Sequence, residues 1–282
     1  MKVPILLPNI FNYPFTYETD LDLKIGDYVI VPFGKTNSTG VVWDHFEKEN
    51  QKIYNLKKVI KKLNTKPIKV STINFLNWFS EYNLTPKGMS LRLHLLSNEA
   101  IENFPNSEYQ QYNTKQKTNN FVLSEEQKIS VDELRQNNSK FRVHVLQGTT
   151  GSGKTVVYFN SIKEKITDGY QGLILLPEIG LTFEFEKKFK DFFGFTAAIW
   201  HSGITKKNKK IIWSGLASGK IKVVIGARSA LFLPFDKLGI IIVDEEHDQS
   251  FKQDEGVIYN ARDMSISRAS FENIPIHLIT SI

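Results

Sequence analysis

A glycine-rich turn between an apolar run and a helix-forming stretch constrains this chain more than any other feature. The stretch "VLQGTTGSGKTVVYF" begins at Val145 and has the spacing of a phosphate-binding loop: Gly148, four residues, then Gly153, Lys154 and Thr155. Glycines let backbone N–H groups turn inward and hold phosphate oxygens at a helix N-terminus, where the helix dipole favours negative charge. A strand-like segment precedes the loop and a helix-like one follows it, so the pattern predicts a nucleotide site rather than a plain Gly-rich turn.

Each residue of this loop has an expected role. We expect Lys154 to reach the β- and γ-phosphates of ATP and the Thr155 hydroxyl to ligate Mg²⁺. The other contacts to the nucleotide are expected from the loop itself, at Gly148, Thr149, Thr150, Gly151, Ser152 and Gly153.

Acidic residues end a second apolar run, "IIIVDEEHD". A buried strand with this ending places Asp244 at the carboxyl edge of a sheet, beside the phosphate loop, where it can hold Mg²⁺ through water. Glu245 is then placed to orient and deprotonate an attacking water. By itself the run could be a solvated acidic turn. Together with the loop it indicates a P-loop NTPase whose catalytic residues are Lys154, Asp244 and Glu245.

Strand-like and helix-like segments alternate from Phe121 onward. The apolar runs "FRVHVLQG", "GLILLPE", "FTAAIWHS", "IKVVIGA" and "LGIIIVDEE" are bounded by Gly, Pro or charge, and helical segments such as "LTFEFEKKFKDFFG" lie between them. Near-continuous apolar strands that alternate with helices predict an α/β lobe with a parallel sheet buried on both faces.

The N-terminal part has a different pattern. "DYVIVPFGK" and "STGVVWDHF" predict short strands of a small β-rich, barrel-like domain, and "VSTINFLNWFSEYNL" predicts a helix after it. "SNEAIENFPNSEYQQYNTKQKTNN" is polar and nearly free of aliphatic residues, which is typical of a linker or mobile segment. We therefore predict a β-rich domain over 1–97, a polar linker over 98–120 and the α/β lobe over 121–282.

The composition fits a globular protein with a basic balance. Of 282 residues, 41% are hydrophobic and 23% charged, and the formal net charge of +6 suits a polyanionic partner or simply a soluble basic protein. The absence of cysteine excludes disulfides and thiolate zinc sites in this chain. Neither a signal-peptide pattern nor a membrane-spanning run is present, so we expect a cytoplasmic protein with no membrane partner. Two lysine clusters are candidate phosphate contacts or solvated faces: Lys57, Lys58, Lys61 and Lys62, and Lys206, Lys207, Lys209 and Lys210.

Further strings carry a family resemblance. "LLPEIGLT", "HSG", "VVIGARSALFLPF", "DEEHDQSFKQDEG" and "YNARD" together resemble the first motor lobe of the PriA family of superfamily 2 DNA helicases, which restart stalled replication forks. The resemblance implies a RecA-like lobe of an ATP-dependent 3′-to-5′ helicase with ATP and Mg²⁺ as cofactors. "VLSEEQ" matches the family's adenine-reading segment, so Gln127 would hydrogen-bond the base, and His247 would couple the nucleotide site to the DNA side.

The same resemblance implies DNA contacts within the lobe. Phe251 and Tyr259 fall in the family's aromatic-rich loop and would stack on unpaired bases, unless they are ordinary core residues. Arg228 would either meet the DNA backbone or brace the lobe.

The N-terminal part resembles the family's small domain that captures the 3′ end of the nascent strand at a fork. "FNYPF" and "IGDYVIVPFGKTNSTGVV" carry this resemblance, which implies that Phe11 and Tyr13 wall a pocket and that Gly34 and Lys35 lie near the terminal nucleotide. The alternative is core aromatics and a surface turn. Asn12 stands where the family usually has Asp, and an amide accepts a hydrogen bond from a 3′-hydroxyl less strongly than a carboxylate.

Three departures from the family limit the expected activity. The family's winged-helix domain is replaced by the polar linker, the coupling motif at the end of "IPIHLITSI" is degraded to Thr280 and Ser281, and the second motor lobe with its arginine finger and zinc site is absent. We expect weak binding of Mg·ATP, very slow hydrolysis and no unwinding by this chain alone. The two alternatives are the N-terminal part of a restart helicase and a non-catalytic module that binds fork DNA and ATP. The partners implied are forked DNA with a 3′ end, single-stranded DNA, single-stranded-DNA-binding protein and primosome proteins.

Overall fold

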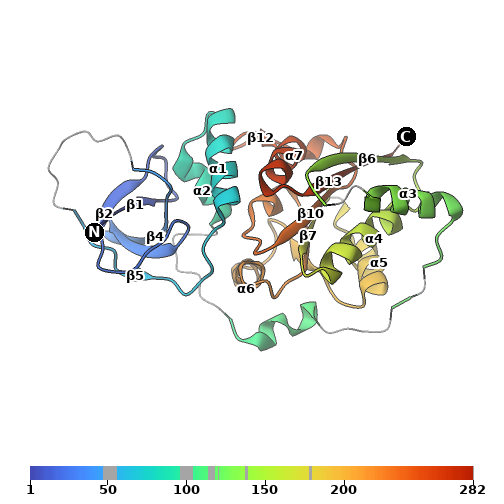
Figure 1. The fold of residues 1–282 in the computed structure, drawn as a ribbon, viewed down its shortest axis with the longest axis horizontal. Coiled ribbons are helices and arrows are strands. Elements are labelled where there is room, and N and C mark those ends of the chain that lie inside the picture. Colours follow the sequence, from blue (N-terminus) through green and yellow to red (C-terminus); the bar gives the residue numbers. More distant parts are fainter. Residues whose placement is uncertain are drawn as a thin grey trace. The chain divides into compact units, whose positions relative to one another are not determined.

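The computed structural model describes residues 1–46, 56–95, 104–113, 118–119, 121–136, 139–177 and 180–281 (Figure 1). The chain forms two compact units. The first comprises Met1–Phe104 and Phe232–Pro234, and the second comprises Pro105–Leu231 and Phe235–Ile282.

An antiparallel sheet forms the first unit, with strand order β2-β1-β4-β3-β5. Its strands are β1 (Lys2–Leu6), β2 (Phe15–Glu18), β3 (Tyr28–Phe33), β4 (Thr36–Val42) and β5 (Lys61–Lys62). Alternate residues such as Val3 and Ile5 on β1 and Val29 and Val31 on β3 are buried in one cluster, as the two-residue repeat of a strand requires. A bridge between Glu18, at the end of β2, and Lys58, just before β5, links the two outer strands of the sheet. The sheet therefore curls toward closure, which confirms the predicted β-rich, barrel-like domain.

Two helices follow in the first unit, α1 (Val70–Tyr82) and α2 (Lys87–His94). On α1 the apolar residues at helical spacing, Ile73, Leu76 and Phe79, are at most 1% exposed, so the predicted helix is confirmed. Phe232, distant in the sequence, also belongs to this unit, with its ring centroid 5.0 Å from that of Phe79.

A parallel sheet with strand order β6-β13-β10-β7-β9-β8 forms the second unit. Its strands are β6 (Arg142–Gly148), β7 (Gln171–Leu175), β8 (Ala198–Trp200), β9 (Val223–Gly226), β10 (Leu238–Val243) and β13 (Pro275–Ser281). Every residue of β7, β9 and β10 is buried, as in a sheet covered on both faces. The predicted RecA-like α/β lobe is thus confirmed. Because β13 lies between β6 and β10, its last residues lie between the phosphate loop and the acidic strand end.

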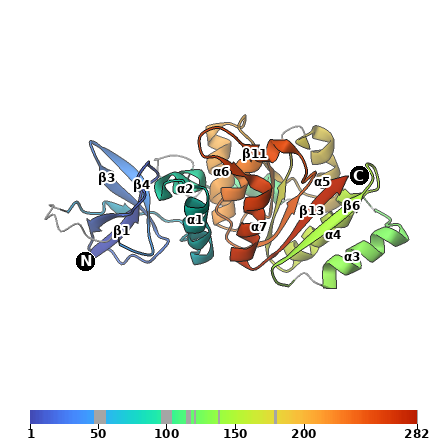
Figure 2. The ribbon, with the colours of Figure 1, turned by 90° about the horizontal axis from the view of Figure 1, so that it is seen from above.

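Helices cover both faces of this sheet (Figure 2). They are α3 (Glu125–Gln136), α4 (Lys154–Thr167), α5 (Phe183–Phe193), α6 (Lys206–Ala217) and α7 (Ala261–Glu272). The helix after the phosphate loop, α4, packs against α5 through Phe159 and Phe189, whose ring centroids are 5.6 Å apart. Both rings belong to a core cluster with Ile174 and Ile242 of the sheet. This packing fixes the start of α4, and so the phosphate loop, on the sheet.

Part of the predicted linker is built into the second unit. The short 3₁₀ helix η1 (Asn106–Tyr112) carries Tyr109, which is 2% exposed and whose hydroxyl donates to the Ser214 Oγ of α6 at 3.1 Å. The Lys220 ammonium lies 4.9 Å from the Tyr109 ring centroid. The predicted linker over 98–120 therefore contains a packed segment at 106–112, where tyrosines supply the buried apolar surface that aliphatic residues do not. The rest of the predicted linker, apart from 104–105, 113 and 118–119, lies outside the described residues.

In the described ranges, no helix is long and apolar enough to cross a membrane.

Candidate functional site

The phosphate loop joins β6 to α4 in the conformation that its glycines permit. Gly151 and Gly153 both have φ of 83°, in the left-handed region that L side chains rarely adopt. A Cβ added to Gly153 would lie 2.3 Å from Nε2 of Gln127, so a larger residue there would displace the Gln127 side chain. Lys154 is the first residue of α4. The loop therefore opens at a helix N-terminus, which is the arrangement that binds phosphate.

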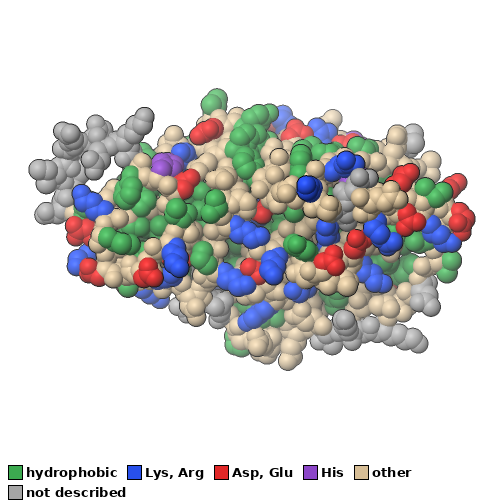
Figure 3. All heavy atoms as spheres, viewed as in Figure 1, with side chains coloured by type: hydrophobic (Ala, Val, Ile, Leu, Met, Phe, Trp, Pro, Cys, Tyr) green, Lys and Arg blue, Asp and Glu red, His purple; other side chains and the backbone are tan. Residues whose placement is uncertain are grey.

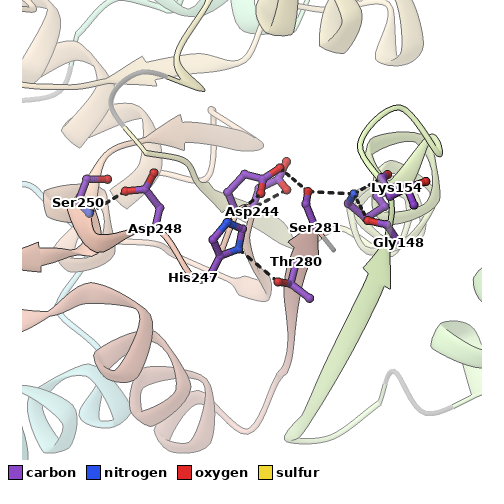
Figure 4. A network of polar contacts seen from close by, with 10 residues as sticks. Gly148, Lys154, Asp244, His247, Asp248, Ser250, Thr280 and Ser281 are labelled. Atoms are coloured by element: carbon purple, nitrogen blue, oxygen red, sulfur yellow. Dashed lines mark hydrogen bonds and ion pairs between the residues drawn. The ribbon is translucent and has the colours of Figure 1, made fainter.

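The Lys154 ammonium has three acceptors around it (Figure 4). Its Nζ donates to the carbonyl oxygens of Gly148 at 2.7 Å and Thr149 at 3.0 Å, and to the Ser281 Oγ at 3.2 Å. A lysine ammonium has three N–H donors, so all of them are used within the site. A phosphate that binds Lys154 must replace some of these acceptors.

The carboxylates lie where the sequence pattern predicts, in the turn after β10. The Asp244 N–H extends the strand pairing by donating to the Leu175 carbonyl at 2.9 Å. Glu245 has φ of 48°, a left-handed conformation that is rare for residues other than glycine. Its Oε1 accepts from the Ser281 Oγ at 3.0 Å. Ser281 therefore connects Lys154 and Glu245, the two residues expected to act on the γ-phosphate and on water.

Asp244 is held by two donors. Its Oδ2 accepts from the Tyr158 hydroxyl at 2.7 Å, and its Oδ1 accepts from the Glu245 N–H at 3.0 Å. Burial raises the pKa of the Asp244 carboxyl, while the hydrogen bonds from Tyr158 and Glu245 oppose that rise. Burial and the adjacent Asp244 raise the pKa of the Tyr158 phenol, so it stays a donor at neutral pH.

The donor set suits Mg²⁺. The Thr155 hydroxyl and the Asp244 carboxylate are oxygen ligands, and Mg²⁺ bound with a nucleotide typically takes one or two protein ligands and several phosphate or water oxygens. In the described part of the chain, no three His, Asp or Glu side chains gather as a metal site of their own. The loop and the strand end thus fit a cation that arrives with a phosphate ligand.

Gln127 is engaged locally. Ser124 and Gln127 form a capping box at the start of α3, in which Gln127 Oε1 accepts from the Ser124 N–H at 3.0 Å and Ser124 Oγ accepts from the Gln127 N–H at 3.2 Å. The Gln127 Nε2 donates to the Ser152 carbonyl at 2.9 Å. This places Gln127 directly on the phosphate loop, with its amide already bonded within the protein.

His247 connects the acidic turn to the end of β13. Its Nδ1 is 3.2 Å from the Thr280 Oγ1, and its Nε2 is 3.6 Å from the Glu245 Oε2. His247 is half exposed, with 52% of its side chain accessible. The structure thus brings the predicted coupling residue into contact with a predicted catalytic one.

Phe251 and Tyr259 do not fit the predicted stacking on DNA bases. They are 1% and 3% exposed, and stacking needs an open ring face. Phe251 ends the 3₁₀ helix η4 (Gln249–Phe251), and Tyr259 lies in the two-residue strand β12 (Tyr259–Asn260), which pairs with β11 (Lys252–Gln253). Both aromatic side chains are core residues of the second unit.

Arg228 braces this same region. It begins the 3₁₀ helix η3 (Arg228–Phe232), and its NH1 donates to the Lys252 carbonyl at 2.5 Å. This hydrogen bond fits the predicted bracing role, and the predicted contact with the DNA backbone stays a prediction.

In the first unit, Phe11 and Tyr13 lie in a chain of ring contacts. The Phe11 centroid is 5.6 Å from that of Tyr13 and 5.3 Å from that of Phe15, and Phe15 lies 5.3 Å from Phe33. Phe11 is 36% exposed. This aromatic cluster (Phe11, Tyr13, Phe15 and Phe33) is therefore packed from within and open to solvent at one end.

The other residues predicted near a 3′ end lie in two turns. Gly34 and Lys35 form the two-residue loop between β3 and β4, where Gly34 has φ of 60° and open space around its Cα. The Asn12 Oδ1 accepts from the Lys87 N–H at 3.0 Å, at the first residue of α2. Asn12 thus satisfies a helix N-terminus.

Two lysines of the first lysine cluster form ion pairs with neighbouring carboxylates. On the face shown in Figure 3, Lys and Arg side chains are interspersed with Asp and Glu. Lys58 pairs with Asp20 at 3.1 Å and Lys62 with Asp27 at 2.7 Å. These contacts favour the solvated-face interpretation for both lysines.

Sequence reasoning missed two residues of the nucleotide site, Tyr158 and Ser281. Tyr158 lies four residues after Lys154, which places both on one face of α4, so helical spacing could have indicated it. Ser281 became significant only because β13 lies between β6 and β10, a strand order that one sequence does not reveal.

Two family models match the chain. The model of the PriA 3'DNA-binding domain (3'BD) matches residues 2–95, and the DEAD/DEAH box helicase model matches residues 124–276. The replication restart protein PriA of Rickettsia conorii is 41% identical over 98% of this chain and 42% of its own length. The PriA protein of Bacillus subtilis is 38% identical over 57% of this chain and 20% of its own length. The crystal structure of the UvsW helicase from bacteriophage T4 aligns with 64% of this chain and 62% of its own, at 18% identity and a TM-score of 0.42. The chain spans about two fifths of the length of the relatives that match it from end to end, 42% in the Rickettsia proteins.

Proposed function

We propose a function on the premise that the chain belongs to the DEAD/DEAH box helicase family and is similar along its length to the N-terminal portion of PriA. The chain supplies the DNA-recognition domain and the first motor lobe of an ATP-dependent 3′-to-5′ DNA helicase that acts in replication-fork restart. Its substrates are ATP with Mg²⁺ and forked or single-stranded DNA with a free 3′ end.

The observation that carries this proposal is the network at the carboxyl edge of the parallel sheet. Ser281 joins Lys154, at the start of α4, to Glu245 in the acidic turn, and Tyr158 of α4 bonds Asp244 in the same turn. In the proposed site, Lys154 binds the β- and γ-phosphates, and Thr155 and Asp244 hold Mg²⁺, which neutralises phosphate charge when bound. Glu245 orients the attacking water and accepts its proton.

Two further contacts of the nucleotide site are part of the proposal. Gln127, which lies on the phosphate loop, exchanges its bond to the Ser152 carbonyl for one to the adenine edge. His247, between Glu245 and Thr280, transmits occupancy of the site to the DNA side of the lobe.

The first unit is proposed to hold the 3′ end of DNA. The open end of the aromatic cluster, at Phe11 and Tyr13, offers ring faces on which terminal bases can stack. Gly34, Lys35 and Asn12 lie in turns of the same unit and contribute the contacts to the terminal nucleotide. Such contacts read the shape of the end and not a base sequence.

These 282 residues supply one wall of the ATP site. In motor proteins of this class, an arginine from a second lobe stabilises the transition state, and an arginine finger contributes about 10³ to 10⁵ in rate where it has been measured. We therefore expect slow hydrolysis by this chain alone, and expect single-stranded-DNA-binding protein and primosome proteins as partners of the complete helicase.

The test is steady-state ATPase activity of the 282-residue chain, with and without forked DNA that carries a free 3′ end, and with Lys154→Ala as the control. Fork binding with turnover at the control's level supports a recognition module that needs a second lobe. DNA-stimulated turnover that Lys154→Ala abolishes supports an active helicase lobe. If the chain binds neither nucleotide nor DNA, the proposal is wrong.

A further inference from the structure

Tyr158 is the buried group at the nucleotide site to which the motifs assign no role. It lies on α4, is fully buried at 0% exposure, and its hydroxyl donates to the Asp244 Oδ2 at 2.7 Å. Thr155, the other expected Mg²⁺ ligand, lies three residues earlier on the same face of the helix. The phenol of Tyr158 therefore bonds the carboxylate that is expected to hold Mg²⁺.

This hydrogen bond leaves Asp244 able to bind a cation, because each carboxylate oxygen can accept a second interaction. The Glu245 N–H fixes the other carboxylate oxygen at 3.0 Å, so the carboxylate of Asp244 cannot rotate freely. The two donors orient the carboxylate without using all of its lone pairs.

Packing alone does not require the buried hydroxyl of Tyr158. A phenylalanine would fill the same space in the core beside Phe159, whose ring centroid is 5.2 Å away, without burying a hydroxyl. A buried hydroxyl is tolerated because it is satisfied by its partners. Its partner here is Asp244, an expected metal ligand.

We propose that Tyr158 is a positioning residue that orients the Asp244 carboxylate, and so determines how much Mg²⁺ strengthens nucleotide binding. This inference rests on the proposed nucleotide site. Groups that orient metal ligands typically contribute about 10- to 100-fold in metal affinity. For Tyr158→Phe we expect Mg²⁺ to strengthen ADP binding about tenfold less than in the unaltered chain, with ADP binding in EDTA unchanged.

The experiment measures the affinity of a fluorescent ADP analogue in Mg²⁺ and in EDTA, and compares the ratio of the two affinities among variants. Tyr109→Phe is the matched control, because Tyr109 is also a buried tyrosine of the second unit whose hydroxyl donates to one side chain, Ser214. A reduced ratio in Tyr158→Phe but not in Tyr109→Phe supports the proposal. Equal ratios in the two variants and the unaltered chain overturn it.

A second comparison keeps the test decisive if Tyr158→Phe also lowers stability. In an Asp244→Asn background, Tyr158→Phe should change the ratio no further, because Tyr158 acts through that carboxylate. Additive losses would contradict the proposal. If the unaltered chain binds no ADP in either condition, the proposed nucleotide site itself fails, and this inference fails with it.

Discussion

The phosphate loop of the second unit and the aromatic cluster of the first unit differ in what their side chains do before a ligand arrives. At the loop, polar groups bond to one another, as Lys154 does with Ser281 and Tyr158 with Asp244. In the cluster, rings touch rings, and Phe11 keeps 36% of its surface exposed. A ligand at the loop must replace internal hydrogen bonds, whereas a base at the cluster covers ring surface that is already open. Binding at the loop should therefore depend on single charged groups, and binding at the cluster on shared apolar area.

Lys154→Ala is expected to give the largest difference between the effects on nucleotide binding and on DNA binding. Truncating one member of a buried charge pair costs about 2–5 kcal/mol, so nucleotide affinity should fall by at least about 30-fold while DNA binding by the first unit stays unchanged. Isothermal titration with ADP and with a 3′-ended oligonucleotide measures both affinities. Lys163→Ala, also on α4 but beyond the loop, is the control and should leave both affinities intact. Retention of ADP affinity in Lys154→Ala would contradict the assignment.

Tyr13→Ala is expected to have the opposite effect and to weaken DNA binding alone. A stacked base contributes about 1–3 kcal/mol, so affinity for a 3′-ended single strand should fall about 5- to 150-fold with no change in nucleotide affinity. Fluorescence anisotropy with a labelled oligonucleotide measures the loss. Tyr82→Ala removes a tyrosine of the first unit that is 64% exposed outside the aromatic cluster, and should have little effect. Equal losses in the two variants would show that the cluster has no special role.

We expect acid to lower the free energy of unfolding of the second unit because His277 is buried in its sheet. Burial, His144 and Lys165 lower the pKa of His277 to about 3, whereas an unfolded histidine titrates near pH 6.5. Below about pH 6.5 the unfolded chain binds the extra proton, so the free energy of unfolding should fall by about 1.4 kcal/mol per pH unit toward pH 3.

Urea unfolding between pH 7 and pH 5 tests this dependence. His277→Leu should flatten it, whereas His45→Gln in the first unit should not. If the free energy of unfolding of His277→Leu still falls with pH, other groups cause the dependence.

The smallest effect is expected for Asn12→Asp. The Asn12 Oδ1 caps the N-terminus of α2 through the Lys87 N–H, and a carboxylate at a helix N-terminus gains about 0.3–1 kcal/mol. We expect the first unit to become more stable by that amount and to bind a 3′-hydroxyl end more tightly than a 3′-phosphate end. Thermal unfolding and competition between the two oligonucleotides measure these changes, and Asn12→Ala should lower the stability instead.

Spacing along the chain predicted where the phosphate loop and the acidic turn lie in the fold. The glycines of the loop, Lys154 and Asp244 follow from local rules, since a strand, a turn and a helix within one short stretch fix the loop. The alternation of apolar strands and helices was also enough for the parallel sheet. The helical spacing of apolar residues was likewise enough to predict α1.

Contacts between distant segments could not be predicted. Whether Phe251 and Tyr259 face solvent depends on how the loop after β10 folds back, and their residue types suit a DNA surface and a core equally. The docking of Tyr109 on α6 likewise depends on a tertiary contact in a segment whose composition is typical of a linker. Gln127 was missed as a cap, although the Ser-x-x-Gln spacing of a capping box is visible in the sequence.

The left-handed backbone at Glu245 places thermostability and the proposed catalytic role in opposition at one position. A side chain held at φ of 48° costs about 1–3 kcal/mol relative to an unstrained conformation, and glycine would relieve most of that cost. Selection for heat resistance alone would therefore favour the replacement that removes the carboxylate. Engineering for robustness should leave this turn untouched and seek its gains in the helices and the barrel.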